Sequence, residues 1–142
     1  MTRHTPAQLM QKWFAEVWNQ RRADLIGVYV SPACKIHALD ETGADTIGPE
    51  GLRSFYVRLL GGLPDIHIEM HEIIESGELV AGRWVATATH RGDDLGVKAT
   101  NNPMTISGMT FLRVANGQIV EAWNEWDRLA MALAIGAVAA VH

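Results

Sequence analysis

Turn signals divide the second half of the chain into four segments of strand length, and this division constrains the fold more than any other feature. Ser76-Gly77-Glu78 separates the first two segments, and a loop over 92–103 separates the middle two. Asn116-Gly117 separates the last two, and Asn-Gly between apolar runs is a strong hairpin signal. The predicted strands are Ile66 to Glu75, Leu79 to Arg91, Met104 to Val114 and Gln118 to Trp126. Their order predicts an antiparallel meander.

The first half of the chain predicts helices. The first helix is expected to begin after Thr5, which would be its N-cap. Gln8 can complete a capping box with Thr5, and Pro6 stands at the first helical position, where proline is tolerated. One broad apolar face follows with helical spacing, formed by Leu9, Met10, Trp13, Phe14, Val17 and Trp18. This face is expected to pack against the sheet.

Two further helices are predicted. A short helix covers Ala23 to Tyr29, and Ser31-Pro32 ends it because the residue before a proline avoids the helical conformation. Gly48-Pro49 opens the next helix, Glu50 to Leu60, and Gly61-Gly62 stops it.

Lys35 to Leu39 is predicted as the one early strand, followed by a polar loop through Asp45. Three helices around one strand and then a meander predict an α+β fold. We expect a curved mixed or antiparallel sheet with about three N-terminal helices on its concave face. The 142 residues are enough for one domain, over residues 1–142. Such a cone has an interior cavity, and apolar concavities are common ligand sites.

The composition excludes several classes of function. The net charge is −4 and lysine and arginine do not cluster, whereas nucleic-acid binding needs a basic surface. No apolar run approaches the ~18 residues that span a membrane, and the N-terminus does not resemble a signal peptide. The single cysteine, Cys34, cannot form an internal disulfide, which fits a cytoplasmic protein. Leu129 to Val141 is expected to pack on the domain or on a partner subunit.

Seven short motifs occur in order along the chain. They are Tyr29-Val30-Ser31-Pro32 with His37 after it, Gly48-Pro49-Glu50-Gly51, Leu63-Pro64-Asp65, Thr89-His90-Arg91-Gly92, Ser107-Gly108-Met109-Thr110, Asn116-Gly117-Gln118-Ile119 and Glu121-Ala122-Trp123-Asn124-Glu125-Trp126-Asp127. With this ordered set the chain resembles the SnoaL-like polyketide cyclases (ester cyclases), which belong to the nuclear-transport-factor-2-like (NTF2-like) superfamily. The resemblance covers nearly the whole chain and implies the α+β cone of that superfamily.

The resemblance also implies a chemistry. Members close a ring by intramolecular aldol condensation of a hydrophobic carbonyl compound, without a metal or an organic cofactor. A carboxylate in the pocket removes a proton from carbon, and polar neighbours hold the enolate oxygen. This chain departs from that pattern, because the cyclase aspartate falls on Asn124 and a cyclase histidine falls on Thr110. An amide cannot act as a carboxylate base.

Three residues are candidates for catalysis. Asn124 shares strand parity with small and apolar neighbours, so it should point into the cone, either to bind a carbonyl or enolate oxygen or to satisfy nearby backbone. Asp127 has the opposite parity, and it either turns inward at the end of the strand or caps a helix that begins at Arg128. The resemblance places His37 near the pocket mouth, while the alternative is a half-exposed strand histidine.

Six residues are candidates for substrate binding, and each has an alternative structural role. They are Trp126, Thr110, Trp18, Tyr56, Trp84 and His90. The aromatic residues either line a pocket or belong to an ordinary core. Strand alternation gives His90 the interior face, although a histidine at the end of a strand can equally hold the following loop.

Two further patterns concern the surface. His67, Glu69 and His71 alternate on one strand, and this spacing is more typical of a solvated face than of a metal site, so we expect no metal. Trp123 has the parity opposite to Asn124. An exposed tryptophan on the outer face of a sheet predicts a homodimer formed through the sheets, as relatives commonly form.

The sequence leaves two functions open. The first is a cofactor-independent enzyme that performs acid/base chemistry, such as aldol-type cyclisation or a related isomerase, lyase or hydroxylase reaction, on a hydrophobic carbonyl compound such as a polyketide. The second is a non-catalytic dimeric domain that binds a hydrophobic ligand. The missing strand aspartate favours the second, and the polar residues on the interior face favour the first.

Overall fold

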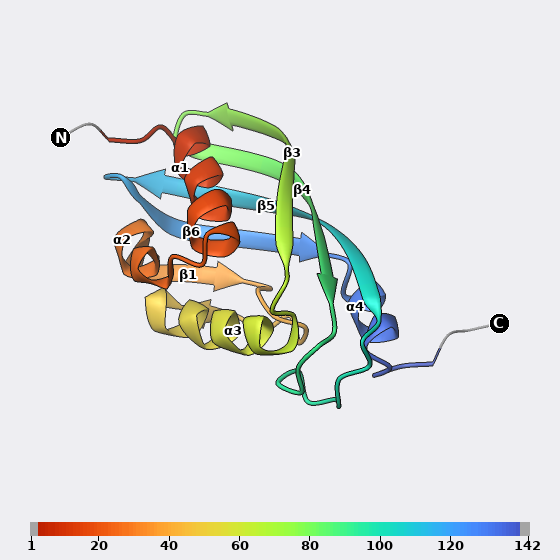
Figure 1. The fold of residues 1–142 in the computed structure, drawn as a ribbon. Coiled ribbons are helices and arrows are strands. Elements are labelled where there is room, and N and C mark those ends of the chain that lie inside the picture. Colours follow the sequence, from red (N-terminus) through yellow and green to blue (C-terminus); the bar gives the residue numbers. More distant parts are fainter. Residues whose placement is uncertain (1–2, 140–142) are drawn as a thin grey trace.

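The computed structural model describes residues 3–139 and contains one six-stranded sheet (Figure 1). The strands lie in the order β2-β1-β6-β5-β4-β3, and every neighbouring pair is antiparallel except β1 and β6, which are parallel. The strands are β1 (Val30–His37), β2 (Thr46–Ile47), β3 (His67–Ser76), β4 (Leu79–Thr89), β5 (Pro103–Ala115) and β6 (Gln118–Trp126). The predicted meander is therefore confirmed as β3 to β6.

Helices cover one face of this sheet. The helical segments are α1 (Pro6–Lys12), the π-helix η1 (Trp13–Asn19), the 3₁₀ turn η2 (Ala23–Leu25), α2 (Ile26–Tyr29), α3 (Gly48–Gly62) and α4 (Arg128–Ala134). Figure 1 shows α1 and η1 crossing in front of the strands, α3 running beside β1, and α4 at the opposite end of the sheet. The α+β fold with N-terminal helices on one face is thus confirmed.

The first helix begins as predicted and then changes its winding. The Thr5 side chain accepts a hydrogen bond from Gln8 N at 3.1 Å, and Gln8 Oε1 accepts from Thr5 N at 3.0 Å, which completes the capping box. From Trp13 the helix widens into a π-helix, in which Gln20 N donates to Ala15 O at 3.0 Å. π-helical turns are rare and frequent at functional sites. This one carries three of the aromatic residues that reach the interior.

Several elements differ from the prediction by a residue or two at their ends, such as β4, which ends at Thr89 instead of Arg91, and three further differences concern pairing or packing. β1 begins at Val30 instead of Lys35, because Val30 pairs with Ile119 of β6 before the register shifts. The short β2 pairs with the end of β1 and was not predicted. The third helix runs through Gly61-Gly62, where a stop was predicted. Gly92 approaches so closely that a Cβ on it would lie 1.7 Å from Gly61 O, so glycine here permits packing between the loop and α3.

The hairpin between β5 and β6 sets which residues face inward. Asn116 and Gly117 both have positive φ, 54° and 75°, as the predicted two-residue turn requires. A bulge follows, because Arg113 pairs with Glu121 while Val114 pairs with Ile119. This bulge moves Ile119 into the interior, where simple alternation predicts Val120.

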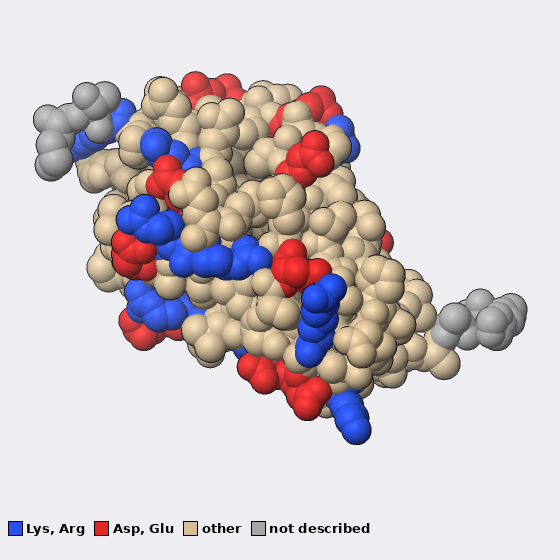
Figure 2. All heavy atoms as spheres, in the orientation of Figure 1, with Lys and Arg blue, Asp and Glu red and all other residues tan. Residues whose placement is uncertain are grey.

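The surface drawn in Figure 2 carries acidic and basic side chains close to one another, without a large area of one sign. This agrees with the absence of a lysine or arginine cluster in the sequence. Between residues 3 and 139, no helix combines the length and the apolar character that a membrane span requires. The predicted packing of Leu129 to Val141 can be followed only to residue 139; there Met131 and Ile135 are buried against the domain, and residues 140–141 lie outside the described part.

Candidate functional site

A largely apolar cavity of about 90 Å³ lies between the sheet and the helices. Aromatic side chains from four elements form much of its wall: Trp13, Phe14 and Trp18 from η1, Phe55 from α3, Trp84 from β4 and Trp126 from β6. Aliphatic residues fill most of the remainder. A wall of this composition is typical of a binding site for an apolar molecule.

A hydrogen-bonded chain of polar groups crosses one side of this cavity. Trp84 Nε1 donates to Thr110 Oγ1 at 3.0 Å, and Thr110 Oγ1 donates to Asn124 Oδ1 at 3.2 Å. Asn124 Nδ2 then donates to the backbone oxygen of His37 at 3.2 Å. Because a carbonyl oxygen can only accept, this last bond fixes the orientation of the amide.

Asn124 has one donor left over. A primary amide carries two N–H groups, and among the described residues only the His37 oxygen accepts from Nδ2. Among the described residues, Asn124 and Thr110 supply the only amide and hydroxyl side chains of the cavity wall. The remaining N–H is therefore suited to hold a carbonyl oxygen of a molecule inside the cone.

The position of Trp84 depends on a glycine of the neighbouring strand. Gly108 pairs with Trp84 across β4 and β5, and a Cβ on Gly108 would lie 2.3 Å from the indole ring. The missing side chain leaves room for the ring to lie across β5 toward Thr110. The motif residue Gly108 thus positions the first donor of the polar chain.

Trp126 and Arg128 connect β6 to the segment after β1. Trp126 Nε1 donates to Leu39 O at 3.1 Å, and the Arg128 guanidinium lies 4.9 Å from the centre of the Trp126 ring. Arg128 also donates to Asp40 O at 2.9 Å and to Ala38 O at 2.6 Å. These contacts fix the chain that borders the cavity at Leu39.

No ionised base lines the cavity in the described part of the chain. The wall residues between positions 3 and 139 include no aspartate, glutamate, histidine, lysine or arginine. Cys34 lies on the wall, but burial raises the pKa of its thiol to about 11, with a further contribution from the Glu121 carboxylate. The thiol is therefore protonated at neutral pH, and a protonated thiol is a poor nucleophile.

His37 lies on the outer face of the sheet. Its neighbour Ile36 is buried and lines the cavity, so His37 has the opposite direction on β1. The ring contacts Glu121 Oε2 at 2.8 Å and Asp45 Oδ1 at 3.1 Å, and it stacks on Trp123. The hydrogen bond to Glu121 is the main cause that raises the pKa of His37. The side chain does not reach the cavity, although its backbone oxygen holds Asn124.

Asp127 occupies the N-cap of α4, which is the structural alternative considered for it. Its Oδ1 accepts a hydrogen bond from Ala130 N at 2.9 Å, and the residue does not line the cavity. The end of β6 therefore does not turn this carboxylate inward.

Replacing Asp127 by alanine is expected to lower the free energy of unfolding by about 1 kcal/mol, the usual cost of losing an N-cap. Ligand affinity should change little, because the carboxylate lies outside the cavity. Urea unfolding and a binding titration on the same variant measure both quantities, with Asp127→Ser as a control that retains a capping oxygen. A loss of binding without a loss of stability would contradict the capping role.

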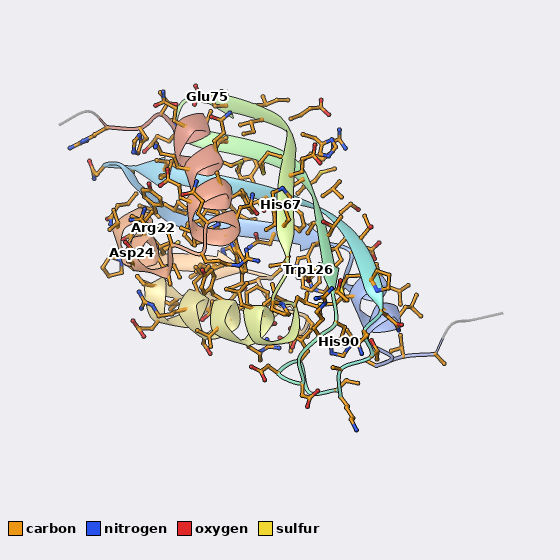
Figure 3. All side chains as sticks on the ribbon, in the orientation of Figure 1. Arg22, Asp24, His67, Glu75, His90 and Trp126 are labelled. Atoms are coloured by element: carbon orange, nitrogen blue, oxygen red, sulfur yellow. The ribbon has the colours of Figure 1, made fainter. Side chains whose placement is uncertain are left out.

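The remaining predicted residues divide into two groups. Trp18 lines the cavity, whereas Tyr56 packs behind it, 4.9 Å between ring centres, and donates to Val17 O at 2.9 Å. His90 is fully buried near α4 (Figure 3) and holds the following loop, since its Nδ1 accepts from Thr100 N at 3.2 Å. His90 Nε2 has no partner among the described residues. The cavity wall thus contains Asn124, Thr110, Trp126, Trp18 and Trp84 of the nine candidates.

Sequence reasoning missed two wall residues that lie outside the long strands and the N-terminal helices. Met131 of α4 and Leu39 after β1 both line it. Neither residue belongs to an amphipathic pattern long enough to assign a direction. Their position depends on how α4 packs back on the sheet.

The described residues contain no group of three or more histidine, cysteine, aspartate or glutamate side chains placed to hold a metal ion. His67, Glu69 and His71 are exposed on β3, while Ile68 beside them faces the interior. Figure 3 shows His67 on β3, the edge strand of the sheet, away from α4.

Comparisons with known proteins agree with this architecture. The family model for the SnoaL-like polyketide cyclases matches residues 8–135. No curated protein sequence matches the chain. Among solved structures, IdmH from Streptomyces antibioticus, a proposed polyketide cyclase, is 26% identical with a TM-score of 0.80, over 94% of this chain and 99% of that one.

Two further structures share the fold. A proposed SnoaL-like polyketide cyclase from Jannaschia sp. CCS1 is 22% identical with a TM-score of 0.82, over 94% of this chain and 93% of that one. AclR from Streptomyces galilaeus, a proposed hydroxylase, is 23% identical with a TM-score of 0.83, over 96% of this chain and 88% of that one. With the family model matched over nearly its whole length, the chain belongs to the SnoaL-like polyketide cyclase family.

Proposed function

We propose that this chain binds a small hydrophobic carbonyl compound of the polyketide type inside the cone, with the carbonyl oxygen on Asn124. The observation that carries this proposal is the unused Asn124 N–H on a wall that is largely apolar. An N–H group that faces an apolar wall is costly unless it is paired, and a ligand carbonyl would pair it. The aromatic wall supplies most of the binding free energy, and the amide orients the ligand.

A matched pair of probes tests this proposal. Acetophenone and α-methylstyrene have nearly the same shape, but only the ketone has an acceptor. The chain should bind the ketone about 2- to 10-fold more tightly than the alkene, the value of one hydrogen bond. Asn124→Leu should remove this preference while keeping affinity for the alkene. Isothermal titration calorimetry measures the affinity of each protein for the ketone and the alkene. If Asn124→Leu still prefers the ketone, the carbonyl oxygen does not bind to Asn124.

Catalysis is the second candidate, and family membership over residues 8–135 favours it. In an intramolecular aldol closure, an enolate carbon bonds to a second carbonyl carbon, and the displaced proton ends on the new alkoxide oxygen. Asn124 would be the oxyanion donor. Proton removal would fall to the substrate itself or to water, because no carboxylate or imidazole lines the described wall. The reaction needs no cofactor and gives a product of unchanged mass.

The two candidates differ in a simple observable. Ligand binding alone returns the added compound unchanged, whereas a cyclase returns an isomer with a different retention time and the same mass. Incubation of a linear poly-β-ketone with the protein, followed by chromatography and mass spectrometry, separates them. Asn124→Leu serves as the control, since loss of the oxyanion donor should lower the rate of an enolate-forming reaction roughly 100-fold or more.

We also propose that two copies pair through the outer face of β5 and β6. Met109 and Phe111 are 60% and 40% exposed there, and Phe111 packs edge-on against Trp123 at 5.5 Å between ring centres. Exposed apolar side chains on one sheet face mark interaction surfaces. Light scattering should give twice the monomer mass, and Phe111→Glu should give the monomer mass. A monomeric wild-type protein would exclude the pairing.

A further inference from the structure

The cavity is small for the ligand class that it would hold. Its volume is about 90 Å³, whereas sites for drug-sized molecules usually measure about 300–1,000 Å³. We therefore expect a compound with a ring or chain of ordinary polyketide size to extend beyond this volume. The part outside would need a neighbouring space.

One residue borders both the cavity and a second space beside α4. Met131 lines the cavity, and it also lines a groove of about 410 Å³ on the outer side of α4. Met131 is the one described residue that lines both spaces, and its side chain is only 3% exposed. Methionine is unbranched and has three rotatable side-chain bonds, so it can change rotamer with little loss of packing.

The helix that carries Met131 is held at both ends. Asp127 caps its N-terminus, and at its C-terminus Ala134 O accepts from Asn102 Nδ2 at 2.9 Å and from Thr100 Oγ1 at 3.3 Å. Movement of α4 as a whole would break these bonds. A rotation of the Met131 side chain alone would leave all of these bonds in place.

The groove is aliphatic beyond Met131. It is lined by Leu95, Leu129, Ala132, Ile135 and Ala137, with Glu41 and Arg128 as its charged residues. Both charged side chains are engaged elsewhere, since Glu41 pairs with Arg58 and Arg128 donates to backbone oxygens before β2. The surface left for a ligand therefore favours hydrocarbon.

We infer that the ligand is elongated, with its carbonyl on Asn124 and an unbranched aliphatic tail that passes Met131 into the groove beside α4. Met131 then determines how long a tail the site accepts. This inference rests on the proposed binding function and adds a substrate class to it, namely long-chain aliphatic ketones and their acyl analogues. It follows from the shared residue, the small cavity and the aliphatic groove.

A homologous series of methyl ketones from butanone to tridecanone tests the inference by calorimetry. In the wild-type protein, affinity should continue to rise roughly fourfold per methylene beyond the length that fills the cavity. Met131→Phe should stop the rise at a shorter chain, with the affinity of each ketone expressed relative to that of butanone for the same variant. Met131→Ala should increase affinity for the longest ketones. Leu133→Ala is the matched control, because Leu133 is exposed on α4 and lines neither space.

Distinct results overturn the inference and the function on which it rests. If butanone binds in an Asn124-dependent way but the chain-length limit is the same in all Met131 variants, the tail does not pass Met131 and the inference fails alone. If Met131→Phe changes the mass of the particle instead of the limit, the groove is a protein contact and the inference also fails. If butanone affinity does not depend on Asn124, the proposed function fails first. Met131→Leu, which conserves volume, keeps the test valid where alanine unfolds the chain.

Discussion

An Asn124→Asp variant is expected to lose stability steeply as the pH rises from about 4 to 7. The introduced carboxyl would face the apolar wall and the His37 backbone oxygen, which lies 3.2 Å from the present Nδ2. A neutral carboxylic acid can donate to that oxygen, whereas a carboxylate is repelled by it. Desolvation adds to this effect, so the folded-state pKa should rise by about two to three units above the unfolded value near 3.9.

The direction of the pH dependence follows from proton binding. Above pH 4 the unfolded chain releases this proton while the folded chain keeps it, so the folded state binds more protons and stability falls as pH rises. The loss is about 1.4 kcal/mol per pH unit and levels off above the raised pKa, at about 3–4 kcal/mol in total. Below pH 4 the variant should approach the stability of the wild-type protein.

Urea unfolding across this pH range measures the effect, and Asn124→Leu supplies the control because it introduces no titratable group. Equal pH profiles for the aspartate variant and the control would mean that position 124 is solvated rather than desolvated. The same variant also tests the catalytic candidate, because a carboxyl with a raised pKa is a suitable general base near neutral pH. Appearance of an isomeric product only in Asn124→Asp would identify a cyclase scaffold without its base.

Local signals in the sequence predicted the elements that depend on neighbouring residues. The capping box of Thr5 and Gln8 and the turn at Asn116-Gly117 each involve atoms within a few residues, and both form as expected. The bounds of β6 agree with the prediction because its flanking signals, the turn before it and the cap at Asp127 after it, are equally local.

Features set by distant contacts were not predictable in the same way. The early start of β1 depends on pairing of Val30 with Ile119, about ninety residues apart. The π-helical winding of η1 buries the same residues as an α-helix would, so an apolar spacing cannot distinguish the two. Gly61-Gly62 carries the local signal of a helix end, but the helix continues through it, and the two glycines instead allow close packing with Gly92.

The candidate site shows the same division. Strand alternation placed Asn124 toward the interior, and the structure puts it on the cavity wall. Alternation could not assign His37, because its predicted strand of five residues had no clear buried face. The burial of Ile36 shows that the His37 side chain points to the outer face, and that burial arises from the parallel pairing of β1 with β6. Residues on the wall were thus predictable from long strands, while the position of Met131 required the packing of α4.

Replacing Trp84 by alanine is expected to lower the free energy of unfolding by about 3–5 kcal/mol, the usual cost of deleting a large core aromatic. The ring is 9% exposed, packs near Phe14 at 6.2 Å between ring centres, and donates to Thr110. Its loss enlarges the cavity and removes the first donor of the polar chain. Trp84→Phe keeps much of the volume, so it should cost less, about 1–3 kcal/mol, which includes the lost hydrogen bond.

Gly108 turns this prediction into a double-mutant test. In the wild-type protein Gly108→Ala should cost about 1–3 kcal/mol, because its Cβ would lie 2.3 Å from the Trp84 ring. In the Trp84→Ala background the same change should be neutral or stabilising, since the ring is absent and alanine is less flexible than glycine in a strand. Urea unfolding of the four proteins gives the coupling energy directly. Additive effects would mean that Gly108 does not make room for Trp84, and that the indole reaches Thr110 for another reason.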